Sequence, residues 1–359
     1  MNPLLDAKAL GQSFWLDNLS RTLLQEGALK KLIEQDGVSG VTSNPSIFHK
    51  AISSGAYYQP DLLKLKSRRL GVEQIYEQLV IPDIQAACDL LQPVYAATKA
   101  DDGYVSLEVA PHLAHEEQAT IDAAMRLHAQ VDRRNLLIKV PATPAGARAV
   151  EKLIGAGISV NITLMFSLHH VMEIAQAYTH GLRHWIANGG DPRPIKSVAS
   201  LFLSRVDTLI DKQLEKIATP EALALRGHAA VAMAKLAYQR YKDIFHGSSF
   251  EDLRKQGARP QYLLWASTGA KNPNYSDLLY VEPLIGRETI NTLPDATLAA
   301  FRDHGRAALT LEQDVKQAQD HILALEKCGI DMRAAGESLQ DEGVKLFAES
   351  YAKLMNLLS

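Results

Sequence analysis

Short apolar segments alternate with longer amphipathic segments along most of this 359-residue chain. The short segments have the length and hydrophobicity of strands buried on both faces, whereas the longer ones carry apolar residues at the i, i+3, i+4 spacing of helices. Turn-forming residues separate the units, as in Asn188-Gly189-Gly190-Asp191-Pro192. We therefore expect strands at residues 13–17, 38–43, 104–109, 136–140, 158–163, 196–202, 261–267 and 278–282.

A strand–helix unit repeated about eight times predicts an α/β protein with a parallel sheet, and eight units fit a closed (β/α)8 TIM barrel. A doubly wound open sheet is the alternative, but no Gly-x-Gly-x-x-Gly follows the first strand. Extra helix patterns occur near residues 60–69 and 72–91, and the chain reads as helix only after about residue 293. We expect one barrel domain over residues 1–359, with additional helices between the second and third strands and a C-terminal helical extension.

The composition is that of a soluble enzyme, with 47% hydrophobic and 22% charged residues. The net charge is 38 minus 41, or −3, and no long block of one sign suggests a nucleic-acid partner. Cys88 and Cys328 lie 240 residues apart, which favours neither a disulfide framework nor a zinc knuckle. The chain lacks a secretory pattern at its start and an apolar run of about 20 residues. These features predict a cytoplasmic protein without a membrane partner, and leave open whether it is a monomer or a homodimer.

Lys139 lies in the apolar run Leu136-Leu137-Ile138-Lys139-Val140-Pro141, which reads as a short buried strand. Burying an ammonium is costly unless it is paired or gives up its proton. An uncharged lysine amine is the group that forms a Schiff base with a carbonyl substrate. The alternative is a lysine at a strand edge whose ammonium reaches solvent.

Polar side chains recur at the C-terminal ends of the expected strands. In a barrel these ends meet at one mouth, where barrel enzymes carry their active sites. Any one of these residues could instead be a turn residue or a helix cap, as Ser43-Asn44-Pro45 illustrates. The same behaviour in six strands predicts one shared site. The residues are Asp17, Thr42, Asn44, Ser106, Glu108, Lys139, Asn161, Thr163 and Ser200.

A lysine surrounded by carboxylates, amides and hydroxyls suits covalent carbonyl chemistry. Imine formation needs proton transfer through a carboxylate and an ordered water, for which Glu108 and Thr163 are candidates. Cleavage of a carbon–carbon bond needs a base for the C4 hydroxyl, for which Asp17 is the candidate. Asn44 and Asn161 could bond substrate hydroxyls.

Metal-dependent aldol chemistry is the alternative mechanism, and it would need a cluster of histidine ligands. The closest approaches to such a cluster are His169-His170 and His112-x-x-His115. We expect both at exposed helix starts.

Two segments are candidates for phosphate binding. The first, Ser200 to Arg205, runs from the sixth strand into a helix, where free amides and Arg205 could hold an anion. The alternative for Arg205 is an ion pair with Asp207 or another helix residue. The second, Ser267 to Asn272, follows the seventh strand and offers Lys271.

The chain resembles the transaldolases, which are class I Schiff-base enzymes of the non-oxidative pentose phosphate pathway. Its length and helical C-terminal region are similar to those of the longer bacterial branch. The segments that carry the resemblance are Gly40 to Ser46, Ser106 to Val109, Leu137 to Pro141, Ser159 to Ser167, and Val198 to Arg205.

The resemblance implies a (β/α)8 barrel with the Schiff-base lysine, Lys139, on the fourth strand. It implies transfer of dihydroxyacetone from sedoheptulose 7-phosphate to glyceraldehyde 3-phosphate, without a cofactor and with sugar phosphates as the binding partners. The implied roles are Asp17 as acid/base, Glu108 and Thr163 for the catalytic water, Asn44 and Asn161 for the dihydroxyacetone unit, and Ser200, Phe202 and Arg205 for the pocket, with Arg205 on a phosphate.

Two positions depart from the family pattern. Ala110 stands where many members carry Asp, and Lys271-Asn272 stands in place of an Arg-Asn pair. Lysine lacks the bidentate fork of arginine, so Lys271 is a weaker candidate for a phosphate ligand. The alternatives are a fructose 6-phosphate aldolase, whose members typically carry Gln at the Glu108 position, and a non-catalytic sugar-phosphate-binding barrel.

Overall fold

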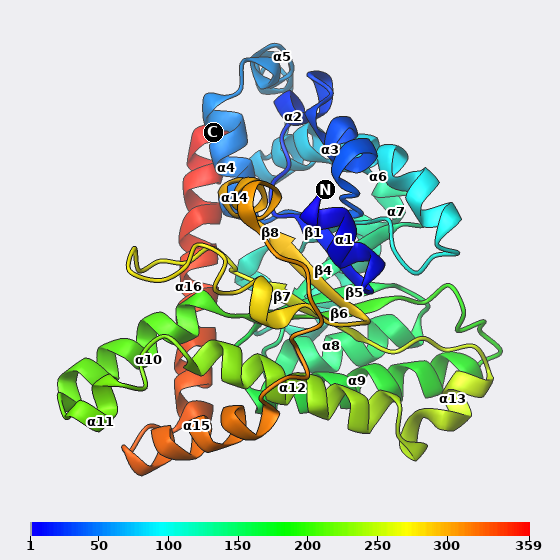
Figure 1. Ribbon diagram of the computed structural model, residues 1–359. Coiled ribbons are helices and arrows are strands. Elements are labelled where there is room, and N and C mark those ends of the chain that lie inside the picture. Colours follow the sequence, from blue (N-terminus) through cyan, green and yellow to red (C-terminus); the bar gives the residue numbers. More distant parts are fainter. Residues whose placement is uncertain (1) are drawn as a thin grey trace.

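The computed structural model describes residues 2–359, and in this range eight parallel strands close into a barrel (Figure 1). Each strand pairs with the next along the chain, and β8 pairs with β1. The predicted (β/α)8 barrel is thereby confirmed. The strands are β1 (Gln12–Leu16), β2 (Gly40–Thr42), β3 (Tyr104–Glu108), β4 (Leu136–Pro141), β5 (Val160–Met165), β6 (Ser197–Phe202), β7 (Tyr262–Ala266) and β8 (Thr289–Leu293).

The eighth strand was predicted at residues 278–282, and this prediction is wrong. Residues 278–281 form turns, and residue 282 begins the short 3-10 helix η4 (Glu282–Leu284). Leu278 and Tyr280 are apolar because they are buried in the core, not because they lie in a strand. The true β8 contains Thr289, Asn291 and Thr292, whose polar groups hydrogen-bond inside the protein. The sequence of this strand is polar because its side chains hydrogen-bond inside the protein, and it was therefore not recognised as a buried strand.

Helices surround the strands in the order expected of a barrel (Figure 1). The helices up to β4 are α1 (Pro3–Ala9), α2 (Arg21–Gln25), α3 (Ala28–Asp36), α4 (Pro45–Ser54), η1 (Ala56–Tyr58), α5 (Gln59–Lys66), α6 (Val72–Ala97), η2 (Pro111–Leu113) and α7 (Glu117–Val131). Those between β4 and β7 are α8 (Pro144–Gly155), α9 (Leu168–Ala187), α10 (Ser204–Ile217), α11 (Pro220–Leu223), α12 (Ala229–Phe245), η3 (Ser248–Phe250) and α13 (Glu251–Lys255). After β8 follow α14 (Asp295–His304), α15 (Val315–Lys327) and α16 (Met332–Leu358). The additional helices between β2 and β3 and at the C-terminus match the prediction.

Side-chain caps start several helices directly after a strand. Asn44, Thr143 and Ser167 each accept a hydrogen bond from a backbone amide in the first turn of α4, α8 and α9, respectively. Such caps satisfy donors that the helix leaves free, so the chain turns sharply at the C-terminal end of the strand. Asn44 is therefore a helix cap, as one interpretation of the sequence had it.

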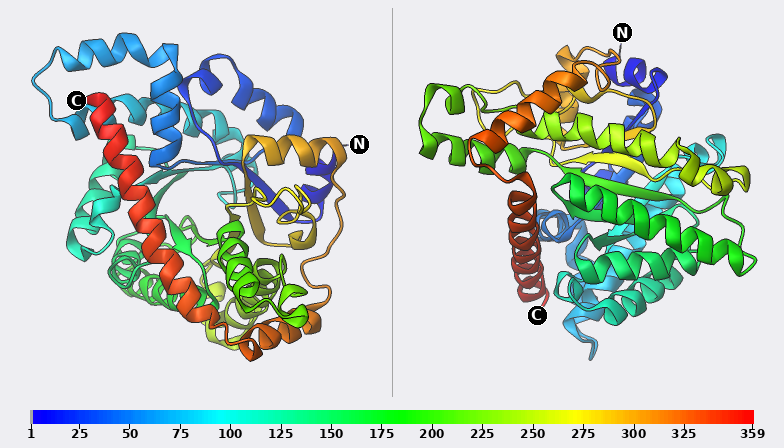
Figure 2. Two further views of the ribbon diagram at one scale, coloured as in Figure 1. Left: turned by 90° about the vertical axis from the view of Figure 1, so that its left-hand side faces the viewer. Right: turned by 90° about the horizontal axis from the view of Figure 1, so that it is seen from below.

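The last helix, α16, lies across the C-terminal end of the barrel, as the left view of Figure 2 shows. It contacts α4, β5, η2, α6 and α10. Apolar residues along a helix do not by themselves show which surface it covers, so this position follows only from the tertiary structure.

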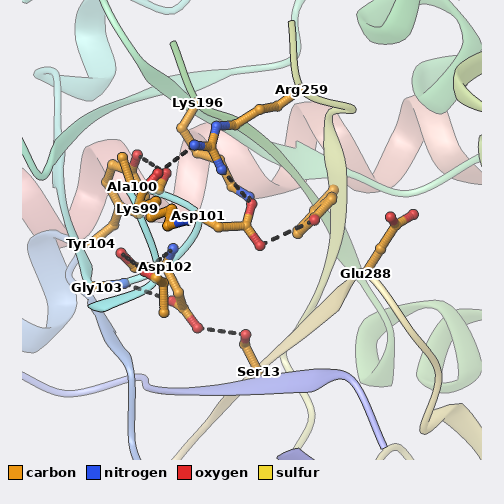
Figure 3. A network of polar contacts seen from close by, with 12 residues as sticks. Ser13, Lys99, Ala100, Asp101, Asp102, Gly103, Tyr104, Lys196, Arg259 and Glu288 are labelled. Carbon is orange, nitrogen blue, oxygen red and sulfur yellow. Dashed lines mark hydrogen bonds and ion pairs between the residues drawn. The ribbon is translucent and has the colours of Figure 1, made fainter. Parts of the chain in front are cut away.

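A polar network closes the opposite end of the barrel (Figure 3). The buried Lys196 amine lies 2.9 Å from Asp101 and 3.5 Å from the ring centroid of Tyr262, and Arg259 also pairs with Asp101 at 3.1 Å. Beside them Asp102 accepts a bond of 2.9 Å from the indole of Trp15. Because the strands β1, β3, β6 and β7 begin here, the network ties together segments distant in the sequence.

Among the helices in residues 2–359, none combines the length and apolar character required to cross a lipid bilayer.

Candidate active site

A cavity of about 170 Å³ opens at the C-terminal ends of the strands. Of the ten site residues expected from the sequence, seven line it. The seven are Asp17, Asn44, Lys139, Thr163, Ser200, Phe202 and Arg205. The other three, Glu108, Asn161 and Lys271, lie beneath the lining or outside it.

Lys139 is buried with 4% of its surface exposed, so the alternative of a strand-edge lysine that reaches solvent is wrong. Its amine lies 3.4 Å from Oε2 of Glu108 and donates a bond of 3.2 Å to the carbonyl of Ser43. Glu108 and Lys139 are register partners on β3 and β4, so their side chains leave the sheet on the same side. Burial raises the pKa of Glu108 to about 7, although the nearby Lys139 charge acts to lower it. Glu108 is therefore a group that can donate and accept protons beside the buried Lys139 amine.

Asp17 follows the last residue of β1 and lines the cavity beside Lys139. Its Oδ1 accepts a bond of 2.8 Å from the hydroxyl of Thr42, and that hydroxyl lies 2.7 Å from the hydroxyl of Thr292. Burial raises the pKa of Asp17, whereas the charge of Lys139 and the bond from Thr42 lower it. The hydroxyl pair fixes the carboxylate in one orientation.

Asn161 lies beneath the cavity lining. Its amide nitrogen donates to Oγ of Ser106 at 3.0 Å, and its carbonyl oxygen accepts from Oγ of Ser200 at 2.7 Å. This chain of bonds joins β3, β5 and β6 and orients Ser200 toward the cavity. A direct contact between Asn161 and a substrate stays a prediction.

Some buried polar atoms at the site make no hydrogen bond within residues 2–359. They are the hydroxyl of Thr163 and both carboxylate oxygens of Glu108, neither of which accepts a hydrogen bond. Buried polar atoms in proteins nearly always bond to protein, ordered water or ligand. These atoms can therefore hold a water or a substrate oxygen.

Arg205 is the second residue of α10 and points toward the cavity. One of its terminal nitrogens is buried and has no partner within residues 2–359. The guanidinium carbon lies 5.8 Å from the ring centroid of Phe202. The alternative ion pair with Asp207 is wrong, because Asp207 accepts bonds from the Ala230 amide and the Tyr280 hydroxyl, both at 2.8 Å. The arginine is thus available for an anion.

Lys271 is exposed in the connection from β7 to β8 and does not line the cavity. It lies close enough for its charge to lower the pKa of Asp17 slightly. The same connection is anchored to α10, because the Tyr275 hydroxyl donates a bond of 2.6 Å to Asp211. A role for Lys271 in phosphate binding stays a prediction.

Five lining residues were not predicted as site residues, namely Ser46, Leu264, Ala266, Thr292 and Phe347. Thr292 was missed because β8 was placed too early in the chain. Phe347 lies in the C-terminal region that was predicted only as helix, and periodicity alone does not show that one residue of a helix faces a cavity.

The histidine pairs do not gather at this cavity. His170 lies in the first turn of α9 and is buried, so the expected exposed position is wrong for this residue. Its Nδ1 accepts a bond of 3.1 Å from the Phe166 amide. Among residues 2–359, no group of three or more histidine, cysteine, aspartate or glutamate side chains is arranged to hold a metal ion.

The fold and the cavity define a barrel protein with a buried lysine and two carboxylates at the end where barrel enzymes carry their active sites. The sequence pattern of the Transaldolase/Fructose-6-phosphate aldolase family matches residues 14–358, and the chain belongs to this family. It is 57% identical to a transaldolase of Thiobacillus denitrificans over 355 residues, which cover 99% of each chain. It is also 46% identical to a transaldolase of Neisseria gonorrhoeae over 99% of each chain. A protein named transaldolase 2 from Nostoc is 44% identical over 100% of this chain and 97% of its own. The resemblance stated from the sequence is confirmed.

Proposed function

We infer that this chain is a transaldolase that transfers dihydroxyacetone from sedoheptulose 7-phosphate to glyceraldehyde 3-phosphate through a Schiff base on Lys139. The observation that carries this proposal is the buried Lys139 amine, which lines the cavity 3.4 Å from a Glu108 oxygen. The names and the near-complete coverage of the relatives support the same activity.

In the first step the Lys139 amine attacks the ketose carbonyl, and the resulting carbinolamine loses water to form an imine. A group that both accepts and donates protons near neutral pH assists this step most effectively. Glu108, with its pKa raised to about 7, is suited to that task. The unpartnered hydroxyl of Thr163 is suited to hold the water involved.

In the second step Asp17 takes the proton of the C4 hydroxyl, and the bond between C3 and C4 breaks. The aldehyde product leaves, and a three-carbon enamine stays on Lys139. Glyceraldehyde 3-phosphate then enters, the enamine carbon attacks its carbonyl to form the new bond, and Asp17 returns its proton to the aldehyde oxygen. Water hydrolyses the final imine, which releases fructose 6-phosphate and restores the amine.

The remaining residues bind the substrate. The oxygen of the Asn44 side chain caps α4, so its amide nitrogen is the group left to donate to a sugar hydroxyl. Arg205 holds the phosphate through its free guanidinium nitrogen, and Lys271 adds charge at the rim. The aldolase alternative is less well supported, because this chain carries Glu108 where those relatives typically carry Gln.

The test is to trap the intermediate by reducing the enzyme with borohydride in the presence of fructose 6-phosphate. We expect a three-carbon adduct that maps to Lys139 by mass spectrometry, and no adduct in Lys139→Ala. Lys345→Ala is the matched control, because it removes an exposed lysine of α16 that does not line the cavity, and it should leave trapping intact. Unchanged labelling of the Lys139→Ala variant would contradict the proposal.

A further inference from the structure

Phe347 brings the C-terminal helix into the active site. The cavity is lined mainly by barrel strands and the turns that follow them, and within residues 2–359 Phe347 is the lining residue that α16 contributes. Its side chain is 5% exposed, and its ring centroid lies 5.9 Å from the Lys139 amine. An aromatic ring therefore faces the nitrogen on which the covalent intermediate forms.

The helix is held in register over the ends of β4 and β5. The amide nitrogen of Gln340 donates to the carbonyls of Ala142 at 2.8 Å and Leu164 at 3.1 Å. Leu164 follows Thr163 and has a φ of 59°, a left-handed conformation that is unfavourable for a residue with a side chain. The bond from Gln340 stabilises the chain at this point.

Close backbone approach prevents α16 from sliding or rotating. A Cβ atom at Gly343 would lie 2.9 Å from the Leu164 side chain, and one at Gly336 would lie 2.7 Å from Cβ of Ser167. Nearer the C-terminus, the hydroxyl of Ser350 accepts a bond of 2.8 Å from Ser46 of α4. The position of Phe347 between these contacts is therefore fixed.

We propose that Phe347 is a specificity-determining residue, which keeps solvent away from the three-carbon enamine on Lys139 and so favours transfer over release of free dihydroxyacetone. This proposal rests on the proposed function. The ring offers no hydrogen-bond partner to water on its side of the cavity. Its face also attracts the positive charge that the nitrogen carries in the iminium form.

The chemistry explains why solvent access on the side covered by Phe347 decides between transfer and release of dihydroxyacetone. When the aldehyde product leaves, it vacates space next to the enamine carbon. A solvent proton that reaches this carbon converts the enamine into the imine of dihydroxyacetone. Water then adds to the imine carbon, the carbon–nitrogen bond breaks, and dihydroxyacetone leaves as the amine is restored. Attack on an aldehyde instead forms a carbon–carbon bond and needs no solvent proton at that carbon.

The experiment compares two rates in the full-length protein. With fructose 6-phosphate as donor, one assay measures dihydroxyacetone released without an acceptor, and the other measures transfer to erythrose 4-phosphate. We expect Phe347→Ala to raise the ratio of release to transfer by about tenfold or more, because excluding water is a main function of closed sites. Phe347→Leu, which keeps part of the apolar volume, should raise it by roughly threefold.

Leu346→Ala is the matched control, because Leu346 is the neighbouring residue on α16, is 38% exposed and does not line the cavity. It should leave the ratio unchanged. Borohydride trapping on Lys139 should persist in all three variants, so its failure in the parent protein would overturn the proposed function and not this inference alone. An unchanged ratio in Phe347→Ala, with trapping retained, would overturn the inference. If that variant does not fold, an unchanged ratio in Phe347→Leu would do the same.

Discussion

Glu108 and Lys139 are register partners on adjacent strands, and 3.4 Å separates the carboxylate oxygen of one from the amine of the other. Both side chains are buried, which is unfavourable for two isolated charges and acceptable for a pair. This relationship combines the two requirements of imine chemistry, a nucleophilic amine and a group that transfers protons near it.

The pH dependence of imine formation tests the role of Glu108. Its raised pKa of about 7 means that the carboxyl is protonated below neutrality and ionised above it. We expect trapping rates in the parent protein to change with an inflection near pH 7. Glu108→Gln cannot titrate, so it should lose this inflection and form the imine about 100-fold more slowly. Retention of the inflection in Glu108→Gln would assign it to a different group.

Asp17→Asn separates imine formation from bond cleavage. The variant keeps the shape of the side chain and the hydrogen bond from Thr42, but it removes the base. We expect borohydride trapping of dihydroxyacetone itself to persist, whereas turnover falls by about 10²–10⁴-fold. Asp295→Asn is the control, because its charge also acts on Asp17 while Asp295 does not line the cavity. Full turnover of Asp17→Asn would remove Asp17 from its role.

Substrates with and without a phosphate test Arg205. Loss of a charged hydrogen bond costs about 1.5–3 kcal/mol, so Arg205→Met should raise KM for sugar phosphates by roughly 10-fold to 100-fold. Activity with unphosphorylated fructose should change little. Lys271→Met should have a smaller effect, because Lys271 is exposed and lies outside the cavity lining. An equal loss with both kinds of substrate in Arg205→Met would show that the arginine is structural.

The pH dependence of folding tests the environment of His170. Burial lowers the pKa of His170 from 6.5 to about 4, so the folded state binds this proton less readily than the unfolded state. The free energy of unfolding should therefore fall as the pH drops from 6.5 to 4, by up to about 3 kcal/mol, and then level off. His170→Gln lacks the titrating group, and denaturant unfolding at several pH values should show a correspondingly weaker dependence. If the free energy of unfolding depended on pH equally in the parent protein and in His170→Gln, the lowered pKa of His170 would be contradicted.

The network at the closed end of the barrel should affect stability and not catalysis. Asp101→Ala leaves the buried Lys196 amine without its carboxylate, and breaking a buried pair typically costs about 3–5 kcal/mol. Because Asp101 is itself partly exposed, we expect a loss of about 2–3 kcal/mol in chemical denaturation. Transfer activity of the folded fraction should be unchanged. Asp101→Asn keeps one acceptor oxygen, which can still accept from Lys196 and Arg259, so this variant should lose less stability.

The sequence by itself determined the barrel and many of the residues that line the cavity. Buried parallel strands must be apolar throughout, so polar residues at their ends, such as Lys139 and Thr163, stand out against the pattern. Parallel strands also place these ends at one mouth, so linear order was enough to bring Asp17, Asn44 and Arg205 together with them.

The remaining features of the site were decided only by contacts between segments that are distant in the sequence. The hydroxyl of Thr292 in β8 bonds to Thr42 in β2, a contact that the linear sequence does not show. Asn161 bonds to its neighbours Ser106 and Ser200 beneath the cavity. Arg205 does not pair with Asp207, because Tyr280 and Ala230 donate hydrogen bonds to that carboxylate. Whether Phe347 packs against the barrel or faces Lys139 depends on how α16 docks, and the spacing of apolar residues along one helix carries no information on that.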